Sequence, residues 1–402
     1  MPENLAPTWD VVINGSIPLP EGVRALVQSL EVEASVDGSD ELTIKALAYD
    51  PTGTVGARWA IVGSTLLAPG NFLTVYAGYQ DGAGLKCLQR FRVVSQEVDY
   101  QAGNVPTVTI RAYSSLSRLA EATDARAWEG PIADSTIVQE LAEAHGLELD
   151  ADPTEERTKG RVKPRGESDL LFIRKLAVAA GYGPPVVRWD DDRKVDVLTF
   201  KAQYVDTSKA LTFTLDPVEA GADLASGNLL SFRAALDLHG VPTHILVMGW
   251  DPAAQAPVVV TMAIGAEGQD PVILTGDQAK GYGITKGGSA FQAKALADSD
   301  DPRDRKLETL ALPSTVDTVE DAIRWATRWI NLRNAAFLTG EATILGHPDV
   351  WTGQVHRFQG LAEIHVGLWE LLTARHRFGP GGYTVSLDLG RVLEDQSEPE
   401  EA

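Results

Sequence analysis

The sequence contains one cysteine, Cys87, among 402 residues. A single thiol excludes an intramolecular disulfide and a zinc site built from several cysteines. Nothing around Cys87 marks a nucleophile, so we expect it to be a small buried apolar side chain. No stretch approaches the roughly 18 apolar residues of a membrane-spanning helix, and residues 1–9 lack the features of a secretory signal. We therefore expect a protein made in the cytoplasm, with no membrane-spanning segment.

Positive charge is also scarce. The chain has 35 Lys and Arg against 56 Asp and Glu, which gives a formal net charge of −21. Such an acidic surface repels a phosphate backbone, which argues against nucleic-acid binding as the main function. The 44% hydrophobic and 23% charged content is ordinary for a folded protein and excludes a disordered, collagenous or fibrous chain. At about 150 residues per domain, the length predicts two or three domains.

Signatures of catalysis are missing as well. None of the seven histidines stands in the H-x-x-x-H spacing of a zinc hydrolase, and there is no G-x-S-x-G elbow, phosphate-binding loop or dinucleotide fingerprint. Asp190, Asp191 and Asp192 are adjacent, whereas calcium loops space their carboxylates. We therefore predict no catalytic residue, no metal and no cofactor. Two alternatives stay open: a metal between His239 and His244, and a spatial pair of carboxylates that cleaves glycosides.

The first hundred residues predict β structure. Apolar residues alternate with polar ones over 30–36 and 42–48, and Asp37-Gly38-Ser39-Asp40 supplies turn residues between them. This pattern predicts a hairpin. Further strands are expected at 72–79, 91–100 and 107–113.

Helical periodicity follows. Ser135 or Thr136 is expected to cap a helix that ends at Gly146, and a second helix is expected to start at Ser168 and end at Gly181. Strands 186–189 and 195–200 then form a hairpin.

Five basic residues lie on alternate positions between these helices: Arg157, Lys159, Arg161, Lys163 and Arg165. In an extended segment they share one face. This pattern is typical of a solvated edge strand, and the alternative is a contact with an acidic partner subunit.

The second half of the chain predicts strands at 210–215, 229–238, 244–250 and 383–389. Residues 264–306 are expected to form an exposed loop or insertion. Thr318 and Asp321 match a capping box for a helix over 318–334, whose core face carries Ile323, Ala326 and Ile330. Trp325 and Trp329 lie one turn apart on it. Residues 394–402 form an acidic tail that we expect to be disordered.

Three segments carry a family resemblance. The first is 135–147, a short apolar helix that ends in His145-Gly146. The second is Gly166-Glu167-Ser168-Asp169-Leu170, which continues through an apolar helix to Gly181. The third lies within 352–389 and includes Gly382-Tyr383-Thr384. Together they resemble the tail hub family of phages and contractile injection systems, the late control D proteins, which includes the hub portion of the type VI spike protein VgrG.

The resemblance implies a fold and an assembly. The fold is β-rich α+β with two tail-tube-like antiparallel β-barrel domains, the first at 1–115 and the second at 208–250 plus 336–392. Residues 116–207 form an α+β insertion, 251–335 a loop and helix insertion, and 393–402 the tail. The resemblance also implies a homotrimeric ring that adapts a six-fold tail tube to a three-fold spike, through which DNA or an effector passes. Because the chain is acidic, we hypothesise that the lumen is negative and repels a DNA backbone.

The implied partners are two further copies, the tail tube protein, a separate central spike protein and other baseplate proteins. The location is a virion tail or an injection-system baseplate, assembled in the bacterial cytoplasm. Two other functions remain as alternatives. One is a tail-associated cell-wall hydrolase. The other is a receptor- or carbohydrate-binding β protein, which the nine tryptophans suggest.

Overall fold

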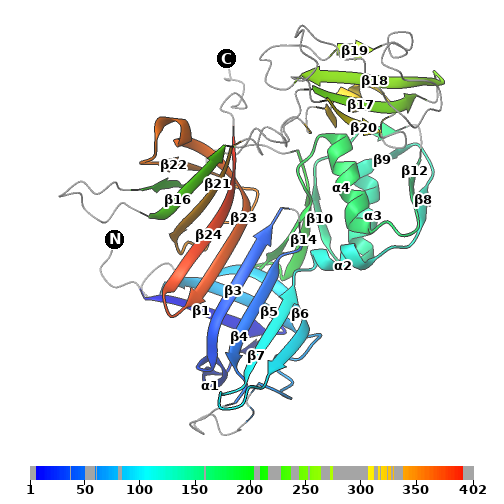
Figure 1. Ribbon diagram of the computed structural model, residues 1–402. Coiled ribbons are helices and arrows are strands. Elements are labelled where there is room, and N and C mark those ends of the chain that lie inside the picture. Colours follow the sequence, from blue (N-terminus) through cyan, green and yellow to red (C-terminus); the bar gives the residue numbers. More distant parts are fainter. Residues whose placement is uncertain are drawn as a thin grey trace.

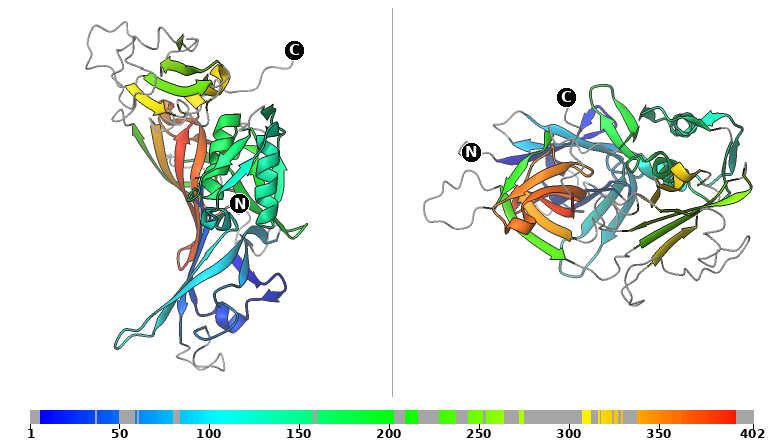
Figure 2. Two further views of the ribbon diagram at one scale, coloured as in Figure 1. Left: turned by 90° about the vertical axis from the view of Figure 1, so that its right-hand side faces the viewer. Right: turned by 90° about the horizontal axis from the view of Figure 1, so that it is seen from above.

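The structure is a computed structural model of the chain. It describes residues 6–36, 38–49, 59, 61–79, 84–157, 160–202, 209–215, 228–236, 244–251, 254–263, 272–274, 307–311, 316, 318–323, 325–326, 329 and 338–392. The fold is β-rich α+β, with a large main sheet, an α/β unit beside it and a smaller third unit (Figure 1). The molecule is elongated, and the third unit and strands β3 to β7 lie at opposite ends (Figure 2).

The main sheet has thirteen strands: β1 (Pro7–Ile13), β2 (Ile17–Pro18), β3 (Val27–Ser35), β4 (Glu41–Leu47), β5 (Phe72–Tyr79), β6 (Lys86–Asp99), β7 (Thr107–Tyr113), β15 (Thr212–Thr214), β16 (Leu229–Leu236), β21 (Leu338–Leu345), β22 (Val355–Gln359), β23 (Gly367–Gly379) and β24 (Gly382–Arg391). The helical turns α1 (Glu21–Arg24) and η3 (Glu363–His365) connect some of them. The predicted hairpin is confirmed, because β3 and β4 pair antiparallel. The predicted strands at 72–79, 91–100, 107–113 and 383–389 are confirmed as β5, β6, β7 and β24.

Period-two alternation explains this sheet. In β3, Leu30, Val32 and Ala34 are buried while Glu31 and Glu33 face solvent. The same alternation in the neighbouring strands places one face of the sheet in a single apolar cluster that runs from Val11 to Leu389. A sheet with one apolar face must bury that face, and here the curled sheet buries it against itself.

The main sheet consists of two units with the same strand order. The first unit is β3-β4-β7-β6-β5-β1, and the second unit is β16-β21-β24-β23-β22-β15. Taken in chain order, the strands of the two units correspond one to one. The difference is at the end of each unit, where β1 runs antiparallel to β5 but β15 runs parallel to β22. The topology is therefore an internal repeat.

One strand pairing joins the two units. Residues 373–378 of β23 pair antiparallel with residues 30–35 of β3, and we call this pairing the seam. Two separate barrels were expected from the sequence, but the seam merges the units into one sheet. In the part of the chain that the structure describes, the strand pairings do not close either unit into a complete barrel. The side chain of Asn228, at the start of β16, hydrogen-bonds the backbone of Thr212 and Thr214 and so bridges the two ends of the second unit.

The α/β unit contains α2 (Leu116–Glu121), α3 (Asp134–Ala144) and α4 (Asp169–Ala180). Its strands are β8 (Arg126–Trp128), β9 (Ile132–Ala133), β10 (Glu148–Ala151), β11 (Glu156–Arg157), β12 (Arg161–Lys163), β13 (Val186–Asp190) and β14 (Val195–Phe200). The predicted hairpin is confirmed as β13 and β14. The predicted Ser168 cap is also confirmed, because its hydroxyl accepts a hydrogen bond from the Leu171 N–H. The Ser135 or Thr136 cap is wrong, since α3 begins at Asp134.

Glycine ends both long helices. Gly146 has a φ of 69°, its N–H donates to Glu143 O at 3.0 Å, and the Leu147 N–H donates to Ala142 O at 2.9 Å. This pair of bonds is the Schellman motif, which needs a left-handed residue and therefore favours glycine. The same two bonds recur around Gly181.

The third unit has a four-stranded sheet of β17 (His244–Asp251), β18 (Ala256–Ala263), β19 (Val272–Leu274) and β20 (Leu307–Ala311). Residues 244–250 were expected in the second barrel, but β17 pairs with β18 and β20. Because residues 245–248 are all buried, this strand is covered on both faces. Most of the expected loop over 264–306 lies outside the described residues.

The helix expected over 318–334 belongs to the third unit. Its described helical residues are 319–323, 325–326 and 329. Thr318 accepts a hydrogen bond from the Asp321 N–H, as the capping box predicts. Ala326 is fully buried and Trp325 is almost so, while Ile323 packs at the edge of the cluster. Ile330 and the acidic tail lie outside the described residues.

Candidate functional site

The five basic residues predicted to share a face do not form a solvated strand. Arg157 lies in β11, Arg161 and Lys163 lie in β12, and Arg165 is exposed in the following turn. Lys159 lies outside the described residues. In β12 the alternation is reversed, because Val162 is 69% exposed while Arg161 is 7% and Lys163 0% exposed. The basic side chains of β12 thus point into the protein.

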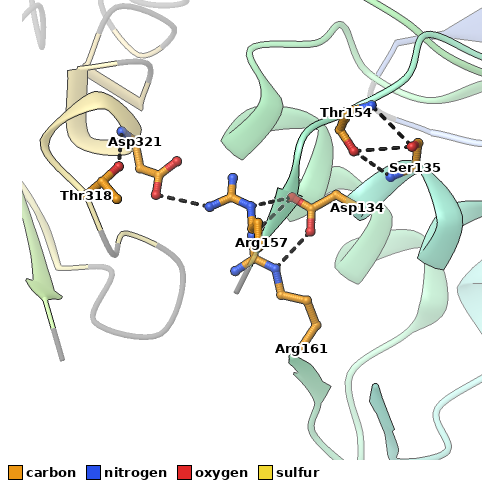
Figure 3. A network of polar contacts seen from close by, with 7 residues as sticks. All are labelled: Asp134, Ser135, Thr154, Arg157, Arg161, Thr318 and Asp321. Carbon is orange, nitrogen blue, oxygen red and sulfur yellow. Dashed lines mark hydrogen bonds and ion pairs between the residues drawn. The ribbon is translucent and has the colours of Figure 1, made fainter. Parts of the chain in front are cut away.

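Arg157 and Arg161 both bind Asp134, the first residue of α3 (Figure 3). Arg161 donates to both carboxylate oxygens at 2.9 and 3.1 Å, and Arg157 Nε donates to Oδ2 at 3.0 Å. Asp134 is 1% exposed. A buried carboxylate needs such bidentate partners, and the positive end of the helix dipole stabilises it further. Ser135 and Thr154 hydrogen-bond each other beside it.

Arg157 also connects the α/β unit to the third unit. Its Nη1 donates to Asp321 Oδ2 at 3.1 Å, and Asp321 is 1% exposed. Burial alone would lower the pKa of Arg157, but the hydrogen bond that it donates to Asp321 and the charges of Asp134 and Asp321 raise it overall. Arg157 therefore stays charged and is held between two acids from different units.

Lys163 belongs to a second buried network. Its Nζ contacts Asp169 Oδ1, and Asp169 Oδ2 lies 2.8 Å from His145 Nε2. Lys163 and Asp169 are both fully buried. Asp169 follows the cap residue Ser168 within the segment that resembles the tail hub family. This network ties β12 to the start of α4 and the end of α3.

Three of the five predicted interface residues thus meet acids of their own chain. The sequence pattern singled out these basic residues, and it missed Asp134 and Asp169 as the acids that Arg157, Arg161 and Lys163 meet. Asp321 was visible only as a capping residue. Arg165 remains exposed. A role for the set in contacting a partner subunit stays a prediction.

A third buried polar cluster joins the α/β unit to the main sheet. Gln89 of β6 donates to Asp40 Oδ2 at 2.9 Å and to Val187 O of β13 at 2.7 Å. Burial raises the pKa of Asp40 to about 6, although the Gln89 hydrogen bond and the Arg188 charge oppose the shift. Arg188 lies over the ring of Trp351, 4.0 Å from its centroid. Strand β13 of the α/β unit is therefore fixed against the first unit of the main sheet through Gln89 and against the second unit through Trp351.

The solvent-facing side of the main sheet is a broad polar surface. It extends over eight strands in the order β16-β21-β24-β23-β3-β4-β7-β6, and we call it the polar face. Its charged residues are eight acids, Glu31, Glu33, Glu41, Glu97, Asp99, Glu341, Glu370 and Asp388, and six bases, Lys45, Arg92, Arg111, Arg233, Arg375 and Arg377. Serine and threonine occupy most of the other positions. The face is therefore hydroxyl-rich and almost neutral.

Charges on the polar face pair across strands. Arg375 Nε lies 2.9 Å from Glu33 Oε2 and 3.4 Å from Glu31 Oε1. Arg377 Nε lies 3.3 Å from Glu31 Oε2. Such paired and partly exposed ions add little affinity for a ligand of either sign.

Two observations on the described residues bear on metal binding and on nucleophilic chemistry. There, no group of three His, Cys, Asp or Glu side chains lies close enough to hold a metal ion. His239 and the side chain of His244 lie outside them, so that alternative is not tested. Burial raises the pKa of Cys87 to about 12, so its thiol stays protonated at neutral pH and is a poor nucleophile. No helix in the described part of the chain is long and apolar enough to span a membrane.

Neither a protein-family model nor a curated protein matches the sequence. Solved structures do match the fold. A tail protein from Neisseria meningitidis aligns over 95% of this chain and 96% of its own length, with a TM-score of 0.63 at 11% identity. The 43 kDa tail protein of prophage MuSo2 from Shewanella oneidensis aligns over 96% and 98%, with a TM-score of 0.61 at 11% identity.

A third match comes from a secretion system. The Escherichia coli c3393 protein is described as a component of the type VI secretion system with structural similarity to the T4 bacteriophage tail proteins gp27 and gp5. It aligns over 94% of this chain and 76% of its own, with a TM-score of 0.50 at 9% identity. At sequence identities this low, these structural matches establish the fold alone. The chain therefore has the fold of phage tail proteins and of this secretion-system component, which confirms at the level of fold the resemblance seen in its sequence.

Proposed function

We propose that this protein is a structural hub of a phage tail or of a related contractile injection baseplate. In this proposal three copies form a ring that adapts the six-fold tail tube to the three-fold spike. The partners are the tube protein, a spike protein and other baseplate proteins. No enzymatic step is required of it.

The observation that carries the proposal is the internal repeat. Two six-stranded units with one topology lie side by side in a single sheet. Three such chains present six similar units, so a three-fold ring can match a six-fold tube on one face and a three-fold spike on the other. The fold match to tail proteins over almost the whole chain supports this reading.

The polar face is the surface that we propose lines the channel. A channel wall must not bind what passes through it, and paired ions with hydroxyl groups present no strong charge of either sign. The sequence-based hypothesis was an acidic lumen, but acids exceed bases by only two on this face. We propose instead a nearly neutral lining, with most of the −21 charge elsewhere.

The domain division is part of the proposal. The first tube-like domain spans 1–115 and the α+β insertion 116–207. The second tube-like domain is built from 208–236 and 338–392, because β17 pairs within the third unit. The third unit then extends the second insertion to include 244–250.

The size of the assembly tests the proposed ring. Sedimentation of the full chain over a range of concentrations, and of particles from cells that carry the whole gene cluster, should show a three-copy species. A cell-wall clearing assay with the same samples tests the alternative that the protein is a cell-wall hydrolase. Clearing by purified chain, or a stable dimer or hexamer in the particle, contradicts the proposal.

A further inference from the structure

Two strands of the main sheet have open backbone edges. β6 pairs with β5 only as far as Arg92, and within the described residues its second half, 94–99, pairs with β7 alone. At the other end of the polar face, β16 pairs with β21 alone among the described strands. The two edges lie on opposite sides of the sheet (Figure 1). An open edge offers unpaired N–H and C=O groups to another strand.

Each open edge carries exposed apolar side chains. Val94, at the bulge between β6 and β7, is 52% exposed, and Leu230, at the bulge between β16 and β21, is 48% exposed. Tyr100, which follows β6, is 63% exposed. Large apolar groups beside an open edge are a common mark of a protein contact.

The internal repeat shows what such edges pair with. β23 holds in the second unit the place that β6 holds in the first, and β3 corresponds to β16. The second half of β23 is not open, because it forms the seam with β3. The open half of β6 therefore corresponds to the half of β23 that forms the seam. The open edge of β16 corresponds to the edge of β3 that β23 pairs with.

The bulges make the correspondence residue-specific. The register of β23 shifts at Leu372, as that of β6 shifts at Val94. The register of β3 shifts at Gln28, as that of β16 shifts at Leu230. Counting from these four positions transfers five of the six pairs of the seam to pairs of described open-edge residues, 96–100 with 236–232.

The transferred register places opposite charges together. In the seam, Arg377 lies opposite Glu31. Arg377 corresponds to Asp99 and Glu31 to Arg233, so the transferred pair is Asp99 with Arg233. The signs are exchanged but remain complementary. The Arg233 side chain is 81% exposed, and its Nη1 lies 3.8 Å from Glu341 Oε2.

The aromatic end of the seam transfers as well. Phe378 lies opposite Leu30 in the seam, and the corresponding open-edge residues are Tyr100 and Phe232. An exposed tyrosine would thus gain a half-buried apolar partner. Aromatic and apolar residues that face each other across strands stabilise a sheet by about 0.2–1 kcal/mol.

We propose that residues 96–100 of one copy, the end of β6 and Tyr100, pair antiparallel with residues 232–236 of β16 in the next copy, in the register of the seam, with Asp99 opposite Arg233. The partner is a second copy because one chain carries both complementary edges. Counting both edge strands, the described sheet has eight strands from β16 to β6, each antiparallel to its neighbours. Since eight is even, β6 meets the next β16 antiparallel, and the contact repeats head to tail until the ring closes.

This inference deepens the proposed ring and rests on it. A charge exchange tests the contact. Asp99→Arg and Arg233→Asp should each raise the concentration needed for assembly about tenfold, and the double variant should restore it. Lys45→Asp is the matched control for Arg233→Asp, because it also replaces a positive charge by a negative one, but on the interior strand β4. It should leave assembly unchanged. Two single variants that assemble like the wild type, or a double variant that stays defective, would overturn the pairing.

Crosslinking tests the register. In a Cys87→Ser chain, Glu97→Cys with Ala235→Cys corresponds to the facing seam pair Arg375 and Glu33. Facing Cα atoms about 4.5–5.5 Å apart lie within disulfide reach. Oxidation in particle-assembling cells should give covalently closed rings. Glu97→Cys with Arg233→Cys is out of register and should crosslink poorly.

The outcomes separate this inference from the proposed function. Rings that assemble but crosslink equally in both double-cysteine variants, or in neither, overturn the β6–β16 contact and leave the ring intact. Particles in which the chain forms no ring contradict both. A matching circular dichroism spectrum for each variant excludes misfolding as the cause of lost assembly.

Discussion

Arg377 of β23 lies directly opposite Glu31 of β3, and 3.3 Å separates the guanidinium Nε from the carboxylate Oε2. This contact crosses the seam between the two units, whose strands are far apart in the sequence. The arginine side chain is 65% exposed. Exposed ion pairs therefore lie on the solvent-facing side of the seam, while its stability comes from the apolar side chains on the buried face of the same strands.

The first prediction separates these contributions. Phe378 is 3% exposed and stacks on Tyr383 with ring centroids 4.0 Å apart. Phe378→Ala should lower the free energy of unfolding by about 3–5 kcal/mol. Glu31→Gln should cost less than about 1 kcal/mol, because exposed ion pairs contribute little. Urea unfolding measures both, and equal losses would show that the ions hold the seam.

The second prediction concerns the joint between the α/β unit and the third unit. Asp321→Ala leaves one guanidinium nitrogen of Arg157 without its carboxylate and should cost about 1–3 kcal/mol locally. Amide exchange in β17 and β18 should accelerate more than exchange in β3 and β4. Glu320→Ala, at the exposed neighbouring position, is the control. If Asp321→Ala accelerated exchange in β17 and β18 no more than in β3 and β4, or no more than Glu320→Ala does, an anchoring role for Asp321 would be contradicted.

The third prediction is a pH dependence. Burial raises the pKa of Asp40 from 3.8 to about 6, so the folded state holds this proton more tightly than the unfolded chain. The stabilisation is present below about pH 4 and is lost as the pH rises through 6. Asp40→Asn stays neutral, so its stability relative to the wild type should improve by up to about 3 kcal/mol between pH 4 and pH 7. A difference that does not change with pH would place Asp40 in solvent.

The fourth prediction uses the close approach of the Gly346 backbone to the ring of Tyr383. A Cβ on Gly346 would lie within 2.1 Å of ring atoms of Tyr383, and the Gly346 carbonyl accepts a hydrogen bond from Tyr79 Oη at 2.7 Å. Gly346→Ala should therefore cost about 1–3 kcal/mol or more. Gly379→Ala is the control, because a Cβ there meets nothing within 4 Å. Equal melting temperatures would show that the Tyr383 ring moves aside freely.

Local patterns predicted local structure well. The pairing of β3 with β4 in a hairpin, the Ser168 cap and the helix ends at Gly146 and Gly181 depend on a few neighbouring residues. Each was therefore readable from the sequence. The α3 start was misjudged because Asp134, which resembles an ordinary capping residue, is used as a buried partner of two arginines.

Long-range pairings were beyond such patterns. The alternation in β23 and β3 predicted two strands but not that they pair, because nothing local encodes a contact between residues 375 and 33. The reversed alternation in β12 has the same origin. A row of basic residues normally faces water, and only distant Asp134 and Asp169 make burial of Arg161 and Lys163 favourable.

The central claim is a three-copy ring between tail tube and spike, and its most direct test is an electron cryo-microscopy reconstruction of the assembled particle. We predict three copies, with six similar β units facing the tube and the polar face lining the channel. Six copies, or a number unrelated to three, would contradict the claim.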